Sequence, residues 1–154
     1  MTAREYLGEI AYIRYKLRYI KKKISELDEE MTTTGAIRYD KDRVQTTPAN
    51  RHEDKIIKLV DIKKKYESAR VSLENDEIQM LSQIDGMPNK THAKILRLRF
   101  FDLAPGDRLH TIGWIADEMG YAEDYVRHQY QDALKGFEEK YLTEKKKTQK
   151  STEN

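Results

Sequence analysis

The sequence contains no cysteine, and it has only three prolines and seven glycines among 154 residues. Without cysteine, disulfide frameworks and thiolate metal sites are excluded, and nothing requires an oxidising compartment. Residues 1–7 hold no apolar signal core, and no stretch approaches the ~20 apolar residues that a membrane span needs. We therefore expect a cytoplasmic protein that does not enter the membrane.

Charged residues are abundant, but neither sign dominates. They make up 36% of the chain, a share that together with the scarcity of glycine and proline favours long solvated helices over a sheet protein rich in turns. The fold class predicted is therefore all-α. Because 29 Lys and Arg stand against 27 Asp and Glu, the net charge is only +2, and any case for nucleic-acid binding must rest on how the charges are distributed.

Apolar residues recur near the start of the chain in alternating steps of four and three. This heptad spacing keeps one seam facing a partner helix, as in a coiled coil, and it predicts a helix over residues 2–31. The run Thr32 to Gly35 interrupts the pattern, and we expect a loop over 32–49. The residues of the seam are Tyr6, Ile10, Ile13, Leu17, Ile20, Ile24, Leu27 and Met31.

A second heptad helix is predicted over residues 50–87. Its start could be supplied by Thr47 with Pro48, or by Asn50 with Glu53 three residues on. The two helices should form a long antiparallel, coiled-coil-like hairpin over residues 1–88. An acidic residue, Asp76 or Glu77, falls in the seam, and we expect local fraying there. The apolar positions are Leu59, Ile62, Tyr66, Ala69, Leu73, Met80, Ile84 and Met87.

Residues 89–142 carry three shorter helical segments, which predict a trihelical domain. Asn89 is placed to cap the first, and Thr111 to cap the second. Gly120 stands where a left-handed residue would end the second, and the third runs over about 123–141. Residues 143–154 are rich in lysine, threonine and glutamate without apolar residues, and should form a disordered basic tail.

The second and third of these segments have the layout of a helix-turn-helix. That motif needs a small residue where its helices cross, a tight turn, and a second helix whose outer face is free for DNA. Ala116 is the small residue, and the turn is Gly120 to Ala122. The side chains expected on the outer face are Asp124, Tyr125, Arg127, His128 and Gln131.

The segment 92–137 contains KILRLRFFD and, after a connector, IGWIADEMGYAEDYVRHQYQDALKGF. It resembles the fourth region of bacterial sigma factors and the sigma-like phage late-gene regulators of the ArpU and RinA type. The likeness to the phage group extends to the long N-terminal helical part and to residues 42–48. The strongest matching positions are Ile115, Ala116, Gly120, Tyr121, Val126, Arg127, Ala133 and Leu134.

This resemblance implies a phage or prophage transcription regulator in the bacterial cytoplasm, which binds promoter DNA and recruits RNA polymerase. It implies that Glu123, Asp124, Arg127 and His128 meet the major groove. Arg127 would donate to guanine or phosphate, and Asp124 would accept from cytosine N4. The residues that we expect to bind double-stranded DNA are Glu123, Asp124, Tyr125, Arg127, His128, Gln131 and Lys135.

The charge of the motif itself opposes DNA. Across residues 111–137 two cations, Arg127 and Lys135, face five carboxylates, which gives 2 − 5 = −3. Negative charge near phosphates weakens binding. Flanking cations could offset it, and they are Lys94, Arg97, Arg99 and Arg108 before the motif and Lys140, Lys145, Lys146, Lys147 and Lys150 after it.

Aromatic residues mark two further features. At about 100° per residue, Tyr12, Tyr15 and Tyr19 lie almost opposite the aliphatic seam of the first helix. Since a two-helix hairpin cannot cover a second stripe, we predict that these tyrosines mediate a homodimer or contact RNA polymerase. Trp114 is expected to be in the core or partly covered, packed between helices, rather than to stack on a base.

No catalytic motif is found. His52, His92, His110 and His128 are scattered without the close helical spacing of a metal site, and there is no phosphate-cradling loop or nucleophile motif. We expect no enzymatic activity, no metal and no cofactor. Two alternatives to a transcription regulator remain: a phage packaging protein similar to a small terminase subunit, and a coiled-coil interaction protein that does not bind DNA.

Overall fold

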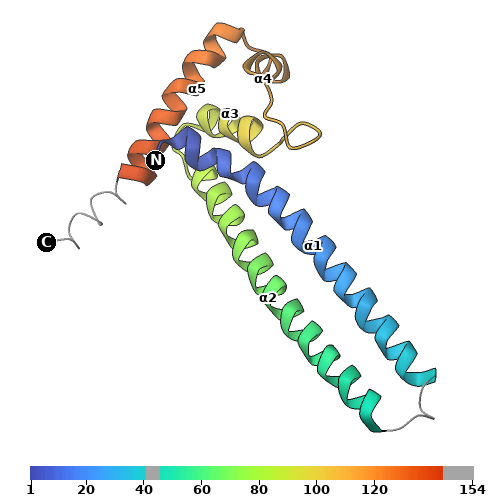
Figure 1. Cartoon of the computed structure of the whole chain (residues 1–154). Coiled ribbons are helices and arrows are strands. Elements are labelled where there is room, and N and C mark those ends of the chain that lie inside the picture. The colour runs from blue at the N-terminus through green and yellow to red at the C-terminus, as the bar shows by residue number, and fades with distance from the viewer. Residues whose placement is uncertain (41–45, 144–154) are drawn as a thin grey trace, which may run out of the picture. The chain divides into compact units, whose positions relative to one another are not determined.

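The computed structural model describes the backbone of residues 1–40 and 46–143, and the side chains of residues 1–33 and 53–143. Throughout these residues the regular structure is helical, and the all-α prediction is confirmed (Figure 1). Residues 144–154, which include most of the predicted disordered tail, lie outside the described part. The elements are α1 (Ala3–Asp40), α2 (Thr46–Asp85), α3 (Lys90–Phe100), α4 (Ile112–Met119), α5 (Glu123–Phe137) and a π-helical turn η1 (Glu138–Leu142).

Helix α1 continues to Asp40, so the predicted end at Met31 is wrong. Two of the threonines that suggested a loop fit the helix because their hydroxyls donate hydrogen bonds to backbone carbonyls one turn earlier. Thr32 Oγ1 donates to the carbonyl of Asp28 and Thr33 Oγ1 to that of Glu29, both at 2.9 Å. A threonine bound in this way satisfies its hydroxyl without leaving helical geometry.

Helix α2 begins at Thr46, earlier than the predicted start at residue 50. Thr47 and Pro48 therefore lie in its first turn. Proline is tolerated there because its missing N–H would have no partner within the helix. Of the predicted loop over 32–49, residues 32–40 and 46–49 are helical, so the prediction is wrong there, and residues 41–45 lie outside the described part.

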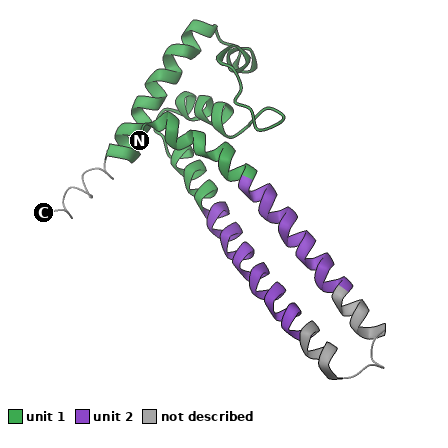
Figure 2. Ribbon diagram, in the orientation of Figure 1, with its two compact units in different colours: residues 1–15, 76–154 green, residues 16–75 purple. Residues whose placement is uncertain are grey.

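The chain divides into two compact units (Figure 2). Unit 1 consists of residues 1–15 and 76–154, and unit 2 of residues 16–75. The prediction placed a domain boundary between residues 88 and 89. In the structure, the beginning of α1 and the end of α2 belong to the same unit as α3, α4 and α5, because their apolar residues are buried in that unit's core.

Unit 2 is a pair of antiparallel helical segments, one from α1 and one from α2 (Figure 2). The α1 residues Leu17, Ile20 and Ile24 and the α2 residue Leu59 are buried. Ile62, which was predicted to lie in the seam, is instead exposed. The stripe of less exposed residues in α2 steps from Leu59 to Lys63 and Tyr66, so Ile62, three positions after Leu59, falls beside it.

Ion pairs join the two helical segments of unit 2. The ammonium of Lys63 lies 2.6 Å from Asp28, and that of Lys55 lies 3.6 Å from Glu30. The hydrogen bond to Asp28 raises the pKa of Lys63. Exposed pairs of this kind contribute little stability. Their order is that of antiparallel segments, because the α1 partner advances from Asp28 to Glu30 while the α2 partner moves back from Lys63 to Lys55.

Unit 1 brings residues 1–15 together with the end of the described chain. The backbone N–H of Ala3 donates to the Glu138 carboxylate at 3.2 Å, and the ring of Tyr6 lies 5.9 Å from that of Phe137. Burial of apolar surface is the dominant stabilising term for such a core. The largest fully buried side chains all belong to this unit, and they are Leu7, Ile10, Ile84, Ile95, Leu96, Phe100, Ile115, Val126 and Phe137.

The acidic residues predicted to disturb the seam do not interrupt α2, which is continuous to Asp85. Glu77 accepts from Nε of Arg14 at 3.1 Å, while Asp76 is exposed. Arg14 also donates to the carbonyl of Phe101, and its guanidinium carbon lies 5.6 Å from the centre of that ring. The expected fraying has no counterpart in the structure, because a cation from α1 compensates the carboxylate.

None of the helices in the described residues has an apolar stretch long enough to span a bilayer. Among the same residues, no three histidine, aspartate or glutamate side chains converge into a group that could hold a metal ion.

Candidate nucleic-acid interface

Helix α4 begins and ends as the sequence predicts. Thr111 caps it, because its hydroxyl accepts from the N–H of Trp114 at 3.1 Å. The predicted cap at α3 is confirmed too, since Asn89 accepts from two backbone amides of that helix. Ile115 and Ala116 turn inward and are buried. Ala116, which was predicted as the small residue where two helices cross, is therefore on the inner side of α4.

The turn after α4 depends on a left-handed glycine. Gly120 has φ 73° and ψ 30°, and its N–H returns to the carbonyls of Ala116 and Asp117. The N–H of Tyr121 also returns to Ala116, at 3.0 Å. A residue with a Cβ is disfavoured in this conformation, so glycine ends the helix and reverses the chain at no steric cost. The prediction of a left-handed cap at Gly120 is confirmed.

Helix α5 has one buried and one exposed face. It packs against α3 and α4, and its buried residues are Val126, Tyr130, Ala133 and Phe137. The helix was predicted to reach residue 141, and the π-helical turn η1 carries it to Leu142. The seven residues predicted to bind DNA are all exposed, and they are Glu123, Asp124, Tyr125, Arg127, His128, Gln131 and Lys135.

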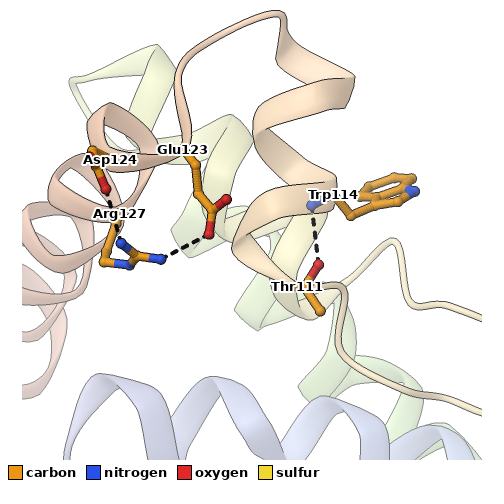
Figure 3. A network of polar contacts seen from close by, with 5 residues as sticks. All are labelled: Thr111, Trp114, Glu123, Asp124 and Arg127. Carbon is orange, nitrogen blue, oxygen red and sulfur yellow. Dashed lines mark hydrogen bonds and ion pairs between the residues drawn. The ribbon is translucent and has the colours of Figure 1, made fainter.

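An ion-pair network occupies the first turns of this exposed face (Figure 3). Arg127 Nη2 donates to Glu123 at 2.9 Å, and its Nη1 donates to Asp124 at 3.1 Å. The three side chains remain accessible, with 51% of Arg127, 56% of Glu123 and 89% of Asp124 exposed. The guanidinium is therefore flanked by two carboxylates on a surface that solvent reaches.

Glu123 also lies against the beginning of α4. A Cβ placed on Gly113 would be 3.5 Å from Glu123 Oε2 and 3.7 Å from its Cδ. The carboxylate thus lies between the first turn of α4 and Arg127 (Figure 3). This proximity was not predicted from the sequence, because Glu123 and Gly113 belong to different helices. The only hint was a glycine, Gly113, in the first turn of a predicted helix.

Gln129 belongs to the edge between the two faces of α5. Its Oε1 lies 2.8 Å from Nε2 of His92 on α3, a hydrogen bond that links the two helices. The residue is partly buried, so its amide needs such a partner. This pairing also assigns His92 a packing role within the trihelical region.

Three aromatic side chains stand near the motif. Trp114 stacks on His110, with ring centres 3.6 Å apart, yet it remains 39% exposed and points away from the Arg127 network (Figure 3). The prediction that Trp114 is packed between helices therefore holds only in part, because the imidazole covers one ring face. Tyr121 and Tyr125 form an edge-on pair, with centres 5.2 Å apart, and both are exposed.

The flanking cations differ in their availability. Arg97 donates to both carboxylate oxygens of Asp85, at 2.6 and 2.8 Å. Arg99 donates to the carbonyl of His110, and its guanidinium carbon lies 5.7 Å from the ring centre of Tyr130. Lys94 and Arg108 are exposed. Hence two of the four cations expected to offset the acidic motif from the N-terminal side already make contacts within unit 1.

Lys140, on the C-terminal side, is also committed, because its ammonium donates to the carbonyl of Gly86 at 2.8 Å. The remaining four lysines named as flanking charge belong to the tail outside the described residues. All five carboxylates of the motif are exposed, and they are Asp117, Glu118, Glu123, Asp124 and Asp132.

The chain was compared with known protein families, with curated proteins and with solved structures, and none of the three comparisons finds a match.

Proposed function

We propose that this chain is a DNA-binding transcription regulator of the phage or prophage type, acting in the cytoplasm of a bacterial host. Helix α5 binds the major groove of promoter DNA, and α1 contacts RNA polymerase or a second copy of the chain. The observation that carries the proposal is that α5 has two different faces: four of its residues are buried within unit 1, while the seven candidate residues are exposed.

The α4–turn–α5 arrangement supports this function. Such a motif presents the N-terminal part of its second helix to base edges. In α5 that part carries Asp124, Arg127 and His128, which are exposed. Arg127 would donate to guanine O6 and N7, and Asp124 would accept from cytosine N4, so the pair is suited to a G·C base pair.

The tyrosines of α1 support a protein contact. Tyr12, Tyr15 and Tyr19 are each exposed, at 57%, 60% and 49%. Tyrosine is enriched at protein interfaces, because it supplies a large contact area with a polar end. We propose that this stripe contacts RNA polymerase or forms a homodimer.

One observation favours a second function, an interaction module without affinity for DNA. Both carboxylates beside Arg127 neutralise it, and the motif exposes five carboxylates in all. Phosphates would be repelled by such a face, whereas a basic protein segment would be attracted.

A binding experiment separates the two functions. Fluorescence anisotropy would measure the affinity for phage late-promoter DNA and for random DNA over a salt series, with the wild type and Arg127→Ala. The control Lys64→Ala removes the same charge from unit 2. We expect specific binding that Arg127→Ala weakens by about 1–3 kcal/mol, with little change for Lys64→Ala. If the wild type binds neither DNA even at low salt, the interaction module is the better account.

A further inference from the structure

Of the two carboxylates in the α5 network, Glu123 is the one that lies beside the start of α4. We infer that Glu123 is a positioning residue, which holds the Arg127 guanidinium in the orientation that reads a guanine. The inference rests on the proposed function and deepens it, because it names the residue on which the sequence specificity of Arg127 depends. Asp124 and the other acidic residues of the motif do not share this role.

Two observations on the Glu123 carboxylate support the inference. Oε1 accepts from Arg127 Nη2 at 2.9 Å. Oε2 faces the start of α4, where a Cβ on Gly113 would be 3.5 Å away, an ordinary van der Waals distance. Glu123 therefore lies beside α4 while it pairs with the arginine of α5 (Figure 3), and the neighbouring helix limits the space open to its side chain.

Asp124 lacks this support. Its side chain is 89% exposed, and it accepts from Nη1 of Arg127 at 3.1 Å. Both ion pairs of Arg127 are open to solvent and contribute little to stability, but Asp124 is much the more exposed of the two carboxylates. Asp124 is thus free to turn toward a base, whereas Glu123 keeps its contact with the arginine.

Arg127 has enough N–H donors to pair with the two carboxylates and to contact a guanine at the same time. A guanidinium carries five N–H donors in a fixed planar fork. One donor on Nη2 is used by Glu123 and one on Nη1 by Asp124. Three donors remain, which exceeds the two that a bidentate contact with guanine O6 and N7 needs. A guanidinium already fixed in orientation loses less conformational freedom when it binds.

The same network could be an ordinary pair of surface salt bridges with no part in recognition. In that case removing Glu123 would act only through charge: a carboxylate near phosphates would be lost, and the affinity for every DNA sequence would rise. A positioning role makes a different prediction, since the preference for one base pair would fall. The ratio of the affinities for two DNA sequences, rather than either affinity alone, distinguishes the positioning role from the charge effect.

The experiment starts with selection from a random DNA pool. Selection with the wild type yields the preferred site, and comparison with Arg127→Ala identifies the base pair that Arg127 reads. Anisotropy titrations then measure the affinity ratio between the preferred site and the site changed at that base pair. The wild type is expected to discriminate about tenfold or more.

Two variants of Glu123 and one control are compared. Glu123→Gln removes the charge, while Glu123→Asp keeps the charge but shortens the side chain by one methylene and so changes where the carboxylate lies relative to Arg127 and the start of α4. We expect both to lose most of the discrimination. Asp132→Asn, on the same helix, removes an exposed carboxylate that has no part in the network, and we expect a higher affinity for all DNA with unchanged discrimination.

The outcomes are distinguishable. If the wild type shows no sequence preference, the proposed function is wrong, and the inference falls with it. If the wild type discriminates through Arg127 and both Glu123 variants keep the wild-type ratio, the inference alone is overturned. Circular dichroism of each variant checks that the overall helix content and the thermal unfolding match the wild type. Loss of discrimination in Glu123→Asp at an unchanged salt dependence would support the positioning role most directly.

Discussion

The hydroxyl of Tyr6 donates a hydrogen bond of 2.8 Å to Oε1 of Gln83, which joins the beginning of α1 to the end of α2 within unit 1. Burial of this phenol raises its pKa above the ordinary value of 10.0, and the bond to Gln83 opposes the shift only partly. The neutral form is therefore favoured in the folded protein. Its contribution to stability is fully present below about pH 10 and is lost as the pH rises through the folded pKa.

We predict that replacing Tyr6 with Phe removes this dependence. The free energy of unfolding in urea should fall less steeply for Tyr6→Phe than for the wild type between about pH 9 and 11. The difference between the two proteins isolates the phenol from other groups that titrate in this range. Parallel curves for the two proteins would show that Tyr6 ionises equally in the folded and unfolded states.

The cap at the start of α4 should be measurable. Thr111→Ala removes the oxygen that accepts from the N–H of Trp114, and we expect a loss of about 1 kcal/mol in the free energy of unfolding. Thr111→Ser keeps an accepting hydroxyl and is the matched control. Urea denaturation of both variants is the measurement, and equal stability of the two would contradict a capping role.

The left-handed turn gives a second stability prediction. Gly120→Ala places a Cβ on a residue at φ 73°, where no heavy atom lies within 4 Å, so the cost is backbone strain alone. We expect a destabilisation of about 1–2 kcal/mol. Gly120→Asn should cost less, because asparagine tolerates this conformation better. Thermal unfolding tests whether the melting temperature falls from the wild type through Gly120→Asn to Gly120→Ala. A Gly120→Ala variant as stable as the wild type would contradict the prediction.

Phe137 should be the most sensitive residue of α5. Its side chain is fully buried, between Tyr6 and Tyr141, whose ring centres lie 5.9 and 4.9 Å away. Phe137→Ala leaves a cavity in the unit 1 core, and we expect a loss of about 3–5 kcal/mol. Phe137→Leu fills more of the space and should lose less. If Phe137→Ala lost no more stability than Phe137→Leu, the surrounding side chains would have to move in and fill the cavity, contrary to this prediction.

Self-association through α1 can be tested by sedimentation. If the tyrosine stripe forms a homodimer, the wild type should dimerise at high concentration, and Tyr15→Ser should shift it toward the monomer. Tyr121→Ser removes another exposed tyrosine and is the control. A wild type that stays monomeric, with unchanged binding of RNA polymerase by Tyr15→Ser, would exclude this role for the stripe.

Features that depend on neighbouring residues could be predicted from the sequence. The caps at Asn89 and Thr111 and the left-handed Gly120 follow from local chemistry, and the heptad spacing identified the two long helices. The end of α1 was missed because threonine is compatible with both a loop and a helix. Only the hydrogen bonds of Thr32 and Thr33 to preceding carbonyls decide between them.

Features that depend on distant residues could not be predicted. Arg14 and Glu77 are separated by 63 positions, so their ion pair is invisible to periodicity. The net charge of the motif was evident from composition, but composition does not say which charges are paired. That Arg97 is occupied by Asp85, and that Glu123 reaches Gly113, emerges only once the helices are packed.

Unit 1 combines residues 1–15 with residues that lie after position 76, and this has a consequence for synthesis. When the first turns of α1 leave the ribosome, the Phe137 and Glu138 side chains that they contact have not yet been made. Tyr6 and Ala3 must therefore wait without these partners on the nascent chain until α5 and η1 emerge. Such late closure by distant segments slows folding and makes truncated chains prone to aggregate.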